Sequence, residues 1–244
     1  MTRTISASPI LGLINAVYVI NLPFRTDRRR EVAAELERVG LSFEDQAVIL
    51  FEAVRPDAAG DFPSIGARGC FMSHLGVLRT AIDTGAASVL ILEDDADFTP
   101  DFVALSAAQI TAIAEADWDI LYLGYLLGDG GGDKRETLIR TIAPATPVRQ
   151  THAMIVRNGA LKRVADYLET MAARPGGHPE GGPMHVDGAY SWFRRDNPDI
   201  KTAVASTPWA IQRASRTDIH GTGLKDRLPF IDFVRRIRNR FQRT

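Results

Sequence analysis

A cluster of acidic side chains directly follows a short apolar run in this chain. Residues 89–92 read Val-Leu-Ile-Leu, which is typical of a strand buried on both faces of a parallel sheet. Glu93, Asp94 and Asp95 come next, and carboxylates are costly to bury unless they are paired or bind a cation. Ligands bind at the carboxyl ends of strands in open α/β sheets, and hard oxygen ligands suit Mg²⁺ or Mn²⁺. The pattern therefore predicts a metal–diphosphate site, with an exposed acidic turn before the next helix as the alternative.

A basic turn follows the first apolar run, residues 17–22, which we expect to form the first strand. Asn21 lies at the end of this strand, and Arg25 and Arg28 lead into a helix that stops at Gly40. Guanidinium groups suit phosphate, and cations at a helix N-terminus oppose the helix dipole unless an anion lies nearby. We therefore expect an anionic ligand at this turn, and the alternative is a solvated helix N-terminus.

Length, charge and cysteine content exclude several classes of protein. The chain has 244 residues, which is enough for one large α/β domain or two small ones. Its net charge of −1 argues against bulk nucleic-acid binding. Cys70 is the single cysteine, so neither a disulfide framework nor a thiolate metal cluster is expected. No apolar run approaches the ~20 residues of a transmembrane helix, and we interpret residues 16–22 as a strand rather than a signal peptide.

The remaining apolar patterns predict further strands and helices. Strands are expected at residues 43–54, 118–124, 148–156 and 203–208, and helices at 64–85, 102–116, 160–168 and 188–193. His74 falls within the first of these helices, where a hydrogen-bonded structural role is more typical than a catalytic one. Residues 128–134 and 174–183 are rich in glycine; we expect a mobile loop near the site at the first, and either a lid or a plain connection at the second.

Residues 224–244 differ from the rest of the chain. Their aromatic and branched side chains fall at helical spacing, and arginines occupy many of the other positions. A basic amphipathic helix is typical of binding to an anionic membrane surface, and the alternative is a helix that packs on its own domain. We therefore divide the chain into a domain at residues 1–223 and a C-terminal helix at residues 224–244.

Short motifs, spread in order between residues 17 and 220, resemble glycosyltransferase family 25, the group of bacterial lipooligosaccharide galactosyltransferases and related collagen galactosyltransferases. The first strand with its basic turn and the acidic segment Leu90 to Asp95 carry much of this likeness. The other matching blocks are Ala47-Val48, Gly69-Cys70 with Ser73-His74, Trp118-Asp119 with Leu123-Gly124, Thr151-His152-Ala153 with Gly159-Ala160, Val186-Asp187, and Pro208 with Gln212, Ser215 and Asp218-Ile219. Gly66-Ala67-Arg68 departs from the pattern, because the family usually carries a glycine and a glutamate there.

The resemblance implies a fold, a donor and a set of metal ligands. The fold is an α/β, GT-A-like (Rossmann-like) single domain with a mostly parallel central sheet flanked by helices, and the donor is a UDP-sugar. We assign Asp95 to a Mn²⁺ or Mg²⁺ ion and Glu93 to the metal or the ribose, because residues two apart on a strand point to the same side. Asp94 would be a second catalytic carboxylate, pointing toward the sugar or a neighbouring cation. Asp97 and His220 are further candidate metal ligands.

The same resemblance implies nucleotide-binding and catalytic residues. Asn21, Arg25 and Arg28 would face the nucleotide, and Asp187 would take the proton of the acceptor hydroxyl as general base, unless it only caps the following helix. The expected protein is an inverting hexosyltransferase that moves galactose from UDP-galactose to a glycan or glycolipid. It would act in lipooligosaccharide or cell-surface polysaccharide synthesis, in the cytoplasm or on the inner face of the membrane. The alternatives are a metal-dependent nucleotidyltransferase or nucleotide-sugar hydrolase, and a catalytically silent nucleotide-sugar-binding module.

Overall fold

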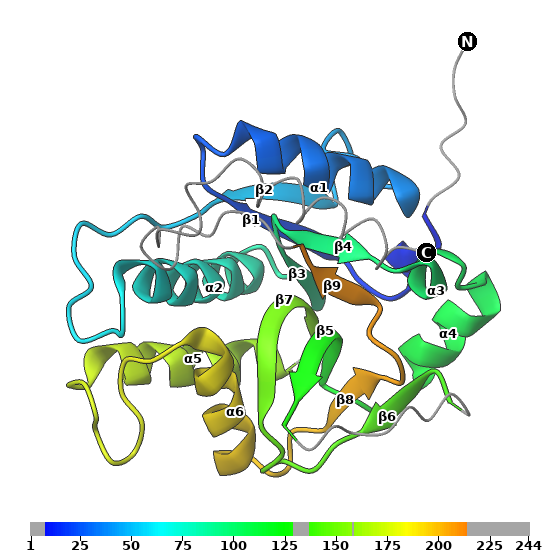
Figure 1. The fold of residues 1–244 in the computed structure, drawn as a ribbon. Coiled ribbons are helices and arrows are strands. Elements are labelled where there is room, and N and C mark those ends of the chain that lie inside the picture. The colour runs from blue at the N-terminus through cyan, green and yellow to red at the C-terminus, as the bar shows by residue number, and fades with distance from the viewer. Residues whose placement is uncertain (1–7, 129–136, 158, 214–244) are drawn as a thin grey trace.

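The computed structural model describes residues 8–128, 137–157 and 159–213, and these ranges contain a seven-stranded sheet flanked by helices (Figure 1). The order of strands across this sheet is β2-β1-β3-β7-β5-β8-β6. Their bounds, in the same order, are Val48–Glu52, Ala16–Asn21, Ser88–Glu93, Val148–Arg157, Ile120–Leu127, Thr202–Ala205 and Ile139–Thr141.

The sheet is mixed but mostly parallel. Strands β2, β1 and β3 pair in parallel, and so do β5 and β8. Strand β7 runs antiparallel to both of its neighbours, β3 and β5, and β6 runs antiparallel to β8. Five of the seven strands therefore point the same way, which confirms the predicted α/β fold class. Strand β6 was not predicted, because it has only three residues and none of them is buried.

Helices cover both faces of the sheet. Helices α2 (Ile65–Asp83), α5 (Gly159–Ala173) and α6 (Val186–Asp196) pack against one another on one face. Helix α1 (Thr26–Arg38) lies on the other side of β1 and β2 (Figure 1). A short 3₁₀ helix, η1 (Pro9–Gly12), precedes the first strand and contacts α4 (Ala107–Glu115).

The predicted helix over residues 102–116 is wrong, because the structure has two helices there. Helix α3 (Pro100–Val103) is a single turn, and α4 begins only after Ser106. Ser106 forms a capping box with Gln109: its hydroxyl accepts the main-chain N–H of Gln109, whose side chain accepts the main-chain N–H of Ser106. This reciprocal pair satisfies two N–H groups that a new helix leaves unpaired, so it starts α4 separately.

A small two-stranded sheet holds the segment after the acidic side chains. Strand β4 (Ala96–Phe98) pairs antiparallel with β9 (Ala210–Gln212). Strand β3 ends at Glu93, Asp94 and Asp95 form a turn, and β4 follows at once. Because β9 comes from the far end of the described chain, this pairing brings Gln212 and Arg213 to the acidic turn.

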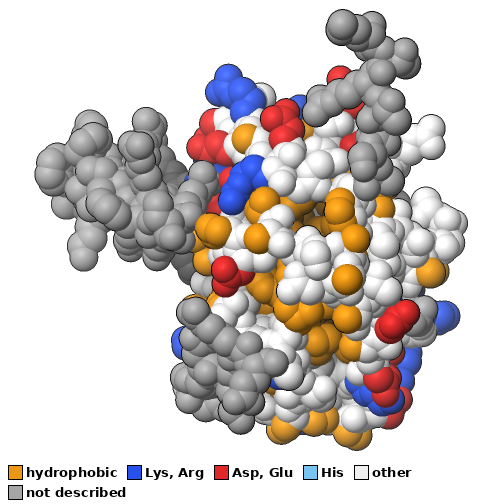
Figure 2. Space-filling view, turned by 90° about the vertical axis from the view of Figure 1, so that its right-hand side faces the viewer, with side chains coloured by type: hydrophobic (Ala, Val, Ile, Leu, Met, Phe, Trp, Pro, Cys, Tyr) orange, Lys and Arg blue, Asp and Glu red, His pale blue; other side chains and the backbone are white. Residues whose placement is uncertain are grey.

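The core is apolar and continuous through the central strands. Residues 89–92 are fully buried, as predicted for a strand covered on both faces, and each such side chain contributes roughly 1.5–3 kcal/mol by leaving water. Figure 2 shows the face that bears α3 and α4, where hydrophobic side chains gather near the centre and charged ones lie mainly toward the rim.

No helix in the described ranges is long and apolar enough to cross a membrane. The loop predicted around residues 129–134, His220 and the C-terminal helix at residues 224–244 lie outside the described residues.

Candidate active site

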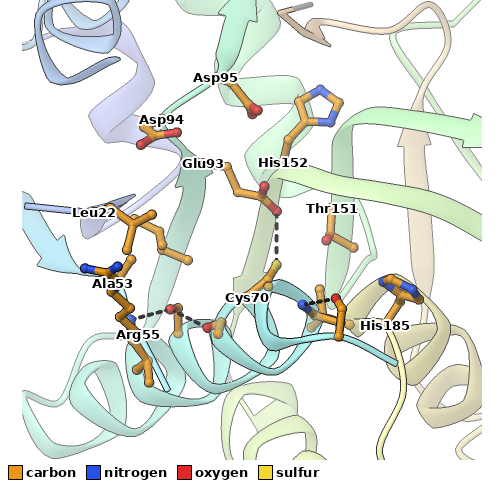
Figure 3. Close-up of a pocket in the computed structure, with 18 of the residues that line it drawn as sticks. Leu22, Ala53, Arg55, Cys70, Glu93, Asp94, Asp95, Thr151, His152 and His185 are labelled. Atoms are coloured by element: carbon orange, nitrogen blue, oxygen red, sulfur yellow. Dashed lines mark hydrogen bonds between the residues drawn. The ribbon is translucent and has the colours of Figure 1, made fainter. Parts of the chain in front are cut away.

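A cavity of about 980 Å³ opens beside the ends of β1 and β3, and distant parts of the chain line it (Figure 3). The acidic turn, the first turns of α2, the first half of β7, the start of α6 and the end of β9 all contribute side chains. Its size is at the upper end of the roughly 300–1,000 Å³ found for small-molecule sites. The cavity therefore lies where ligands bind in open α/β sheets.

Asp94 lines this cavity and is held by two donors from the basic turn. Asn21 Nδ2 donates to Oδ2 at 2.7 Å, and Arg28 Nη1 donates to Oδ1 at 2.9 Å. Burial raises the pKa of Asp94 above its ordinary value, and the Arg28 charge acts against that rise. Arg28 is thus the cation beside Asp94, and Asn21 positions this carboxylate from the end of β1.

Asp95 also lines the cavity, but its carboxylate is incompletely paired. Oδ2 lies 3.4 Å from Gln212 Nε2 and 3.6 Å from Arg28 Nη1, whereas the buried Oδ1 has no hydrogen-bond partner among the described residues. Burial, with a further contribution from the Glu93 charge, raises the pKa of Asp95 to about 7. A buried carboxylate oxygen without a donor is an atom that a cation would satisfy.

Glu93 does not share its surroundings with Asp95 as the alternation of strand residues suggested. Its side chain extends toward α2, where Oε1 lies 3.3 Å from His74 Nε2 and 3.8 Å from Cys70 Sγ (Figure 3). The reason is that β3 ends at Glu93, so the next two residues belong to a turn and do not alternate. Burial acts to raise the pKa of Glu93, but the hydrogen bond and charge of His74 hold it below its usual value.

Asp97 forms a buried ion pair and is not oriented as a free metal ligand. Arg213 donates to its carboxylate and also pairs with Glu31 at 2.5 Å. Asp97 is fully buried, so its negative charge depends on this guanidinium. The Arg213 main-chain N–H also donates to the carbonyl oxygen of Asp95 at 2.7 Å, which fixes the acidic turn from the side of β9.

Asp187 also lines the cavity, from the first turn of α6. His185 occupies the N-cap position of α6 without a side-chain capping hydrogen bond, and Asp187 follows in the first turn. Asp187 Oδ1 accepts the main-chain N–H of Gly188 at 2.7 Å, and Oδ2 accepts that of Gln150 at 3.3 Å. Both oxygens are thus oriented while the side chain stays half-buried at the cavity.

Three residues of β7 line the cavity although their side chains had no predicted role there: Gln150, Thr151 and His152. His152 is 1% exposed, and although the main chain of Ala210 lies close to its ring, neither ring nitrogen reaches hydrogen-bond geometry within the described ranges. Burial lowers the pKa of His152, which favours the neutral ring. Gln150 has a positive φ of 68°, an unusual backbone conformation for a residue with a side chain. Such strain is found at functional sites, and no sequence pattern marks it.

The other predicted site residues lie farther from the cavity or outside the described ranges. Arg25 is at the N-cap of α1, and its guanidinium makes two hydrogen bonds to Asp27, at 3.0 and 2.8 Å. Asn21 is buried behind Asp94. Arg25 and Asn21 are therefore neighbours of the cavity wall, whereas Arg28, Asp94 and Asp95 face the cavity itself.

The donor set fits a hard divalent cation at Asp95. The unpartnered Oδ1 of Asp95 is the free ligand atom, and Asp94 is the adjacent carboxylate that could contribute a second oxygen. Among the described residues, the carboxylate oxygens of Glu93, Asp94 and Asp95 do not all lie within 4.8 Å of one another. One ligand atom each from Cys70, His74 and Glu93 does lie within that distance of the other two. A cation at Asp95 would thus have few protein ligands, as Mg²⁺ commonly has when substrate phosphates supply the rest.

Comparison with known proteins finds similarity to one protein family in the N-terminal half of the chain. Residues 14–127 match the model of glycosyltransferase family 25, described as an LPS biosynthesis protein. A glycosyltransferase 25 family member of Anopheles gambiae is 30% identical over 129 residues, which are 46% of this chain and 22% of that protein. The inactive glycosyltransferase 25 family member 3 of Homo sapiens is 28% identical over 127 residues, which are 44% of this chain and 21% of that protein. Procollagen galactosyltransferase 1 of Danio rerio is 34% identical over 61 residues, which are 24% of this chain and 10% of that protein.

Solved structures show a more distant likeness. A glycosyltransferase involved in glycosylation of the major capsid of PBCV-1 aligns with a TM-score of 0.39 and 14% identity, over 78% of this chain and 91% of that one. A197 from STIV aligns with a TM-score of 0.37 and 10% identity, over 85% of this chain and 98% of that one.

The family match contains both segments that carry the acidic and basic side chains of the cavity. The basic turn at residues 21–28 and the acidic turn at residues 93–95 both lie inside the matched range. The curated relatives are much longer proteins, of which this chain matches about a fifth or less. The predicted resemblance is confirmed for residues 14–127, which match the model of glycosyltransferase family 25.

Proposed function

We propose that this chain is a metal-dependent glycosyltransferase that binds a nucleotide sugar in the cavity and transfers the sugar to an acceptor hydroxyl. The observation that carries the proposal is the buried, unpartnered Oδ1 of Asp95 at the end of β3, beside the Asp94–Arg28 pair. A nucleoside diphosphate gains negative charge as its bond to the sugar breaks, so it needs positive charge at this edge of the sheet. The family of residues 14–127 supports the same reaction class.

Asp95, with Asp94 beside it, would hold Mn²⁺ or Mg²⁺ in this proposal. When bound there, such an ion neutralises charge on the two phosphates and so stabilises the leaving nucleotide. Arg28 contacts both carboxylates, so it sets the spacing of the acidic turn and also offers a guanidinium toward the phosphates. The chain thus supplies both signs of charge that a cation–diphosphate pair requires.

The rim of the cavity offers an aromatic surface for the nucleotide base. Phe24 lines the cavity and is 54% exposed, so its ring is accessible for stacking. Arg55 lies over its ring at 5.1 Å from the centroid. Stacking on Phe24 would place a base next to the basic turn, with the diphosphate directed toward Asp95. We propose uridine as the base and galactose as the sugar; the name procollagen galactosyltransferase 1 of one relative supports galactose.

Asp187 is the proposed general base. Its two oxygens are oriented by main-chain N–H groups of Gly188 and Gln150, and it reaches the cavity from α6 rather than from the acidic turn. A base on a different wall from the leaving group is the arrangement that inversion requires, because the acceptor must attack from the opposite side. Asp187 would receive the acceptor proton, which adds typically 10²–10⁴-fold to the rate.

The acceptor in this proposal is a hydroxyl of a glycan or glycolipid. The description of the family model as an LPS biosynthesis protein supports a role in lipopolysaccharide or cell-surface polysaccharide synthesis. The basic tail at residues 224–244 would then carry the enzyme to an anionic membrane surface on the cytoplasmic side. Vesicle binding by the full chain and by a chain ending at residue 223 tests this part; equal binding would contradict it.

The central test measures donor binding and turnover separately. Titration calorimetry with UDP and with UDP-galactose, each with Mn²⁺ and with EDTA, should show metal-linked binding that is lost in Asp95→Asn. Product analysis with a labelled nucleotide sugar should show a new glycoside when an acceptor is present. Release of free sugar alone would favour a hydrolase, and transfer of the nucleotide would favour a nucleotidyltransferase.

A catalytically silent binding module is the second candidate, because some relatives of similar identity are named inactive. Such a module would bind the nucleotide sugar in the cavity but would not transfer the sugar to an acceptor. Metal-linked UDP binding without any product, across a panel of nucleotide sugars and glycan acceptors, would select this candidate. The absence of metal-linked UDP binding would contradict both.

A further inference from the structure

A second group of potential ligands lies on the wall of the same cavity. Cys70 and His74 are four residues apart on α2, so they lie on one face of that helix, one turn apart. Glu93 comes from the end of β3 and points toward both of them (Figure 3). One atom from each side chain, the thiol sulfur, a ring nitrogen and a carboxylate oxygen, lies within 4.8 Å of the other two.

The spacing of these atoms matches a tetrahedral site for a small, thiophilic cation. Tetrahedral Zn²⁺, with bonds of about 2.3 Å to sulfur and about 2.0–2.1 Å to nitrogen and oxygen, places sulfur and oxygen about 3.5 Å apart and nitrogen and oxygen about 3.4 Å apart. The structure has 3.8 Å between Cys70 Sγ and Glu93 Oε1, and 3.3 Å between His74 Nε2 and Glu93 Oε1. These two distances are close to the tetrahedral values, and the separation between Cys70 Sγ and the His74 ring nitrogen is at most 4.8 Å.

The histidine of this group is oriented by a partner on its other ring nitrogen. His74 Nδ1 lies 3.3 Å from the hydroxyl of Tyr190, a residue of α6, and both side chains are fully buried. Ligating histidines usually have their second nitrogen fixed by an outer hydrogen bond, which sets the tautomer and the ring orientation. Tyr190 supplies such a contact here, so Nε2 is directed at Glu93.

We propose that Cys70, His74 and Glu93 bind a thiophilic divalent cation of the Zn²⁺ class, at a site separate from the hard cation at Asp95. Thiolate and imidazole select Zn²⁺ or Co²⁺ over Mg²⁺, whereas the acidic turn offers oxygen ligands only. The thiol of Cys70 releases its proton to solvent on binding. Because Cys70 and Glu93 line the cavity while His74 lies behind them, the fourth coordination position faces the cavity and stays open to water or a ligand.

This site does not depend on the proposed transfer reaction, and its test reads metal binding rather than activity. Co²⁺ is the probe, because a cobalt–thiolate bond gives a charge-transfer absorption band that Asp and His ligands do not give. Cys70 is the only cysteine in the chain, so the band reports this residue. The full-length protein, stripped with EDTA under reducing conditions, is titrated with Co²⁺, and Zn²⁺ or Mg²⁺ is then added as competitor.

The wild-type chain should bind one equivalent of Co²⁺ with the thiolate band, Zn²⁺ should abolish the band, and Mg²⁺ should not. Asp95→Asn should keep the band, which separates this site from the acidic turn and from the proposed function. His74→Gln should weaken Co²⁺ binding by more than tenfold, and Tyr190→Phe by about 10–100-fold as an outer-shell change. Failure of the wild-type chain to give the band, or unchanged affinity in a folded His74→Gln variant, would overturn the proposal.

A second measurement uses only the wild-type chain, so a folding defect in a variant cannot affect its result. Zn²⁺ should slow alkylation of Cys70 in the wild-type chain at least tenfold, and Mg²⁺ at the same concentration should leave the rate unchanged. Equal alkylation rates with and without Zn²⁺ would refute coordination by this thiol.

Discussion

Replacing Asp95 by asparagine tests the electrostatic argument for the acidic turn directly. In the metal-free protein the pKa of Asp95 is raised from 3.8 to about 7, chiefly by burial and then by the Glu93 charge. Between these values the folded state holds a proton that the unfolded state has lost, so the stability of the wild type falls as the pH rises. Asparagine keeps the shape of the side chain and cannot ionise, so the variant lacks this part of the pH dependence.

The magnitude follows from the two pKa values. A carboxyl group with a folded pKa of about 7 and an unfolded pKa of 3.8 lowers the free energy of unfolding by roughly 3 kcal/mol between pH 5 and pH 8. Since the side chain is only 11% exposed, little of this is screened by solvent. The stability of Asp95→Asn relative to the wild type should therefore rise by roughly 3 kcal/mol across that range.

The assay is urea unfolding in EDTA at pH 5 and pH 8, with both proteins followed by circular dichroism. Asp83→Asn is the matched control, because Asp83 is an exposed carboxylate at the end of α2, and its pH dependence should equal that of the wild type. Mn²⁺ with UDP at 100 times the dissociation constant should then stabilise the wild type by about 2.7 kcal/mol at pH 8 and leave Asp95→Asn unchanged. A stability difference that is the same at both pH values would refute the inference that the turn holds a destabilised buried charge.

Three further substitutions test other parts of the site. Asp187→Asn should keep metal-linked UDP binding while transfer falls by about 10²–10⁴-fold, and unchanged turnover would exclude it as base. Arg213→Met should cost about 3–5 kcal/mol in urea unfolding, because it leaves the fully buried Asp97 without its guanidinium; a loss below 1 kcal/mol would contradict that pairing. Gly124→Ala should cost about 1–3 kcal/mol, since its Cβ would lie 2.1 Å from His152 Nε2, and wild-type thermal stability would show that the cavity wall can yield.

Local patterns were sufficient to predict the strands and turns that carry the charged residues. Strand β3 is an unbroken branched run, and its burial on both faces follows from composition alone. The basic turn was placed correctly for a similar reason, because a strand, a short polar stretch and an amphipathic helix follow one another directly. Such features depend on neighbours within a few residues, which is the range over which hydrophobic periodicity is informative.

The orientation of the Glu93 side chain could not be predicted from local patterns. Alternation predicted that Glu93 and Asp95 face the same way, but alternation holds only within a strand, and β3 stops at Glu93. The side chain instead meets His74 and Cys70, whose helix packs against the sheet. The end of a strand is set by what pairs and packs beyond it, which periodicity does not record.

The sequence by itself determined the fold class, the two charged turns and their place at the carboxyl ends of strands, because each rests on short-range patterns of polarity and on the rule for parallel sheets. That these two strands are neighbours was decided by the tertiary structure. Only the tertiary structure decided which distant side chains join them. Arg213 reaches Asp97 across 116 positions, Gln212 reaches Asp95 across 117, and Tyr190 reaches His74 across 116. These contacts follow from the pairing of β9 with β4 and from the packing of α6 on α2, and such long-range contacts are chosen by the whole core rather than by any local pattern.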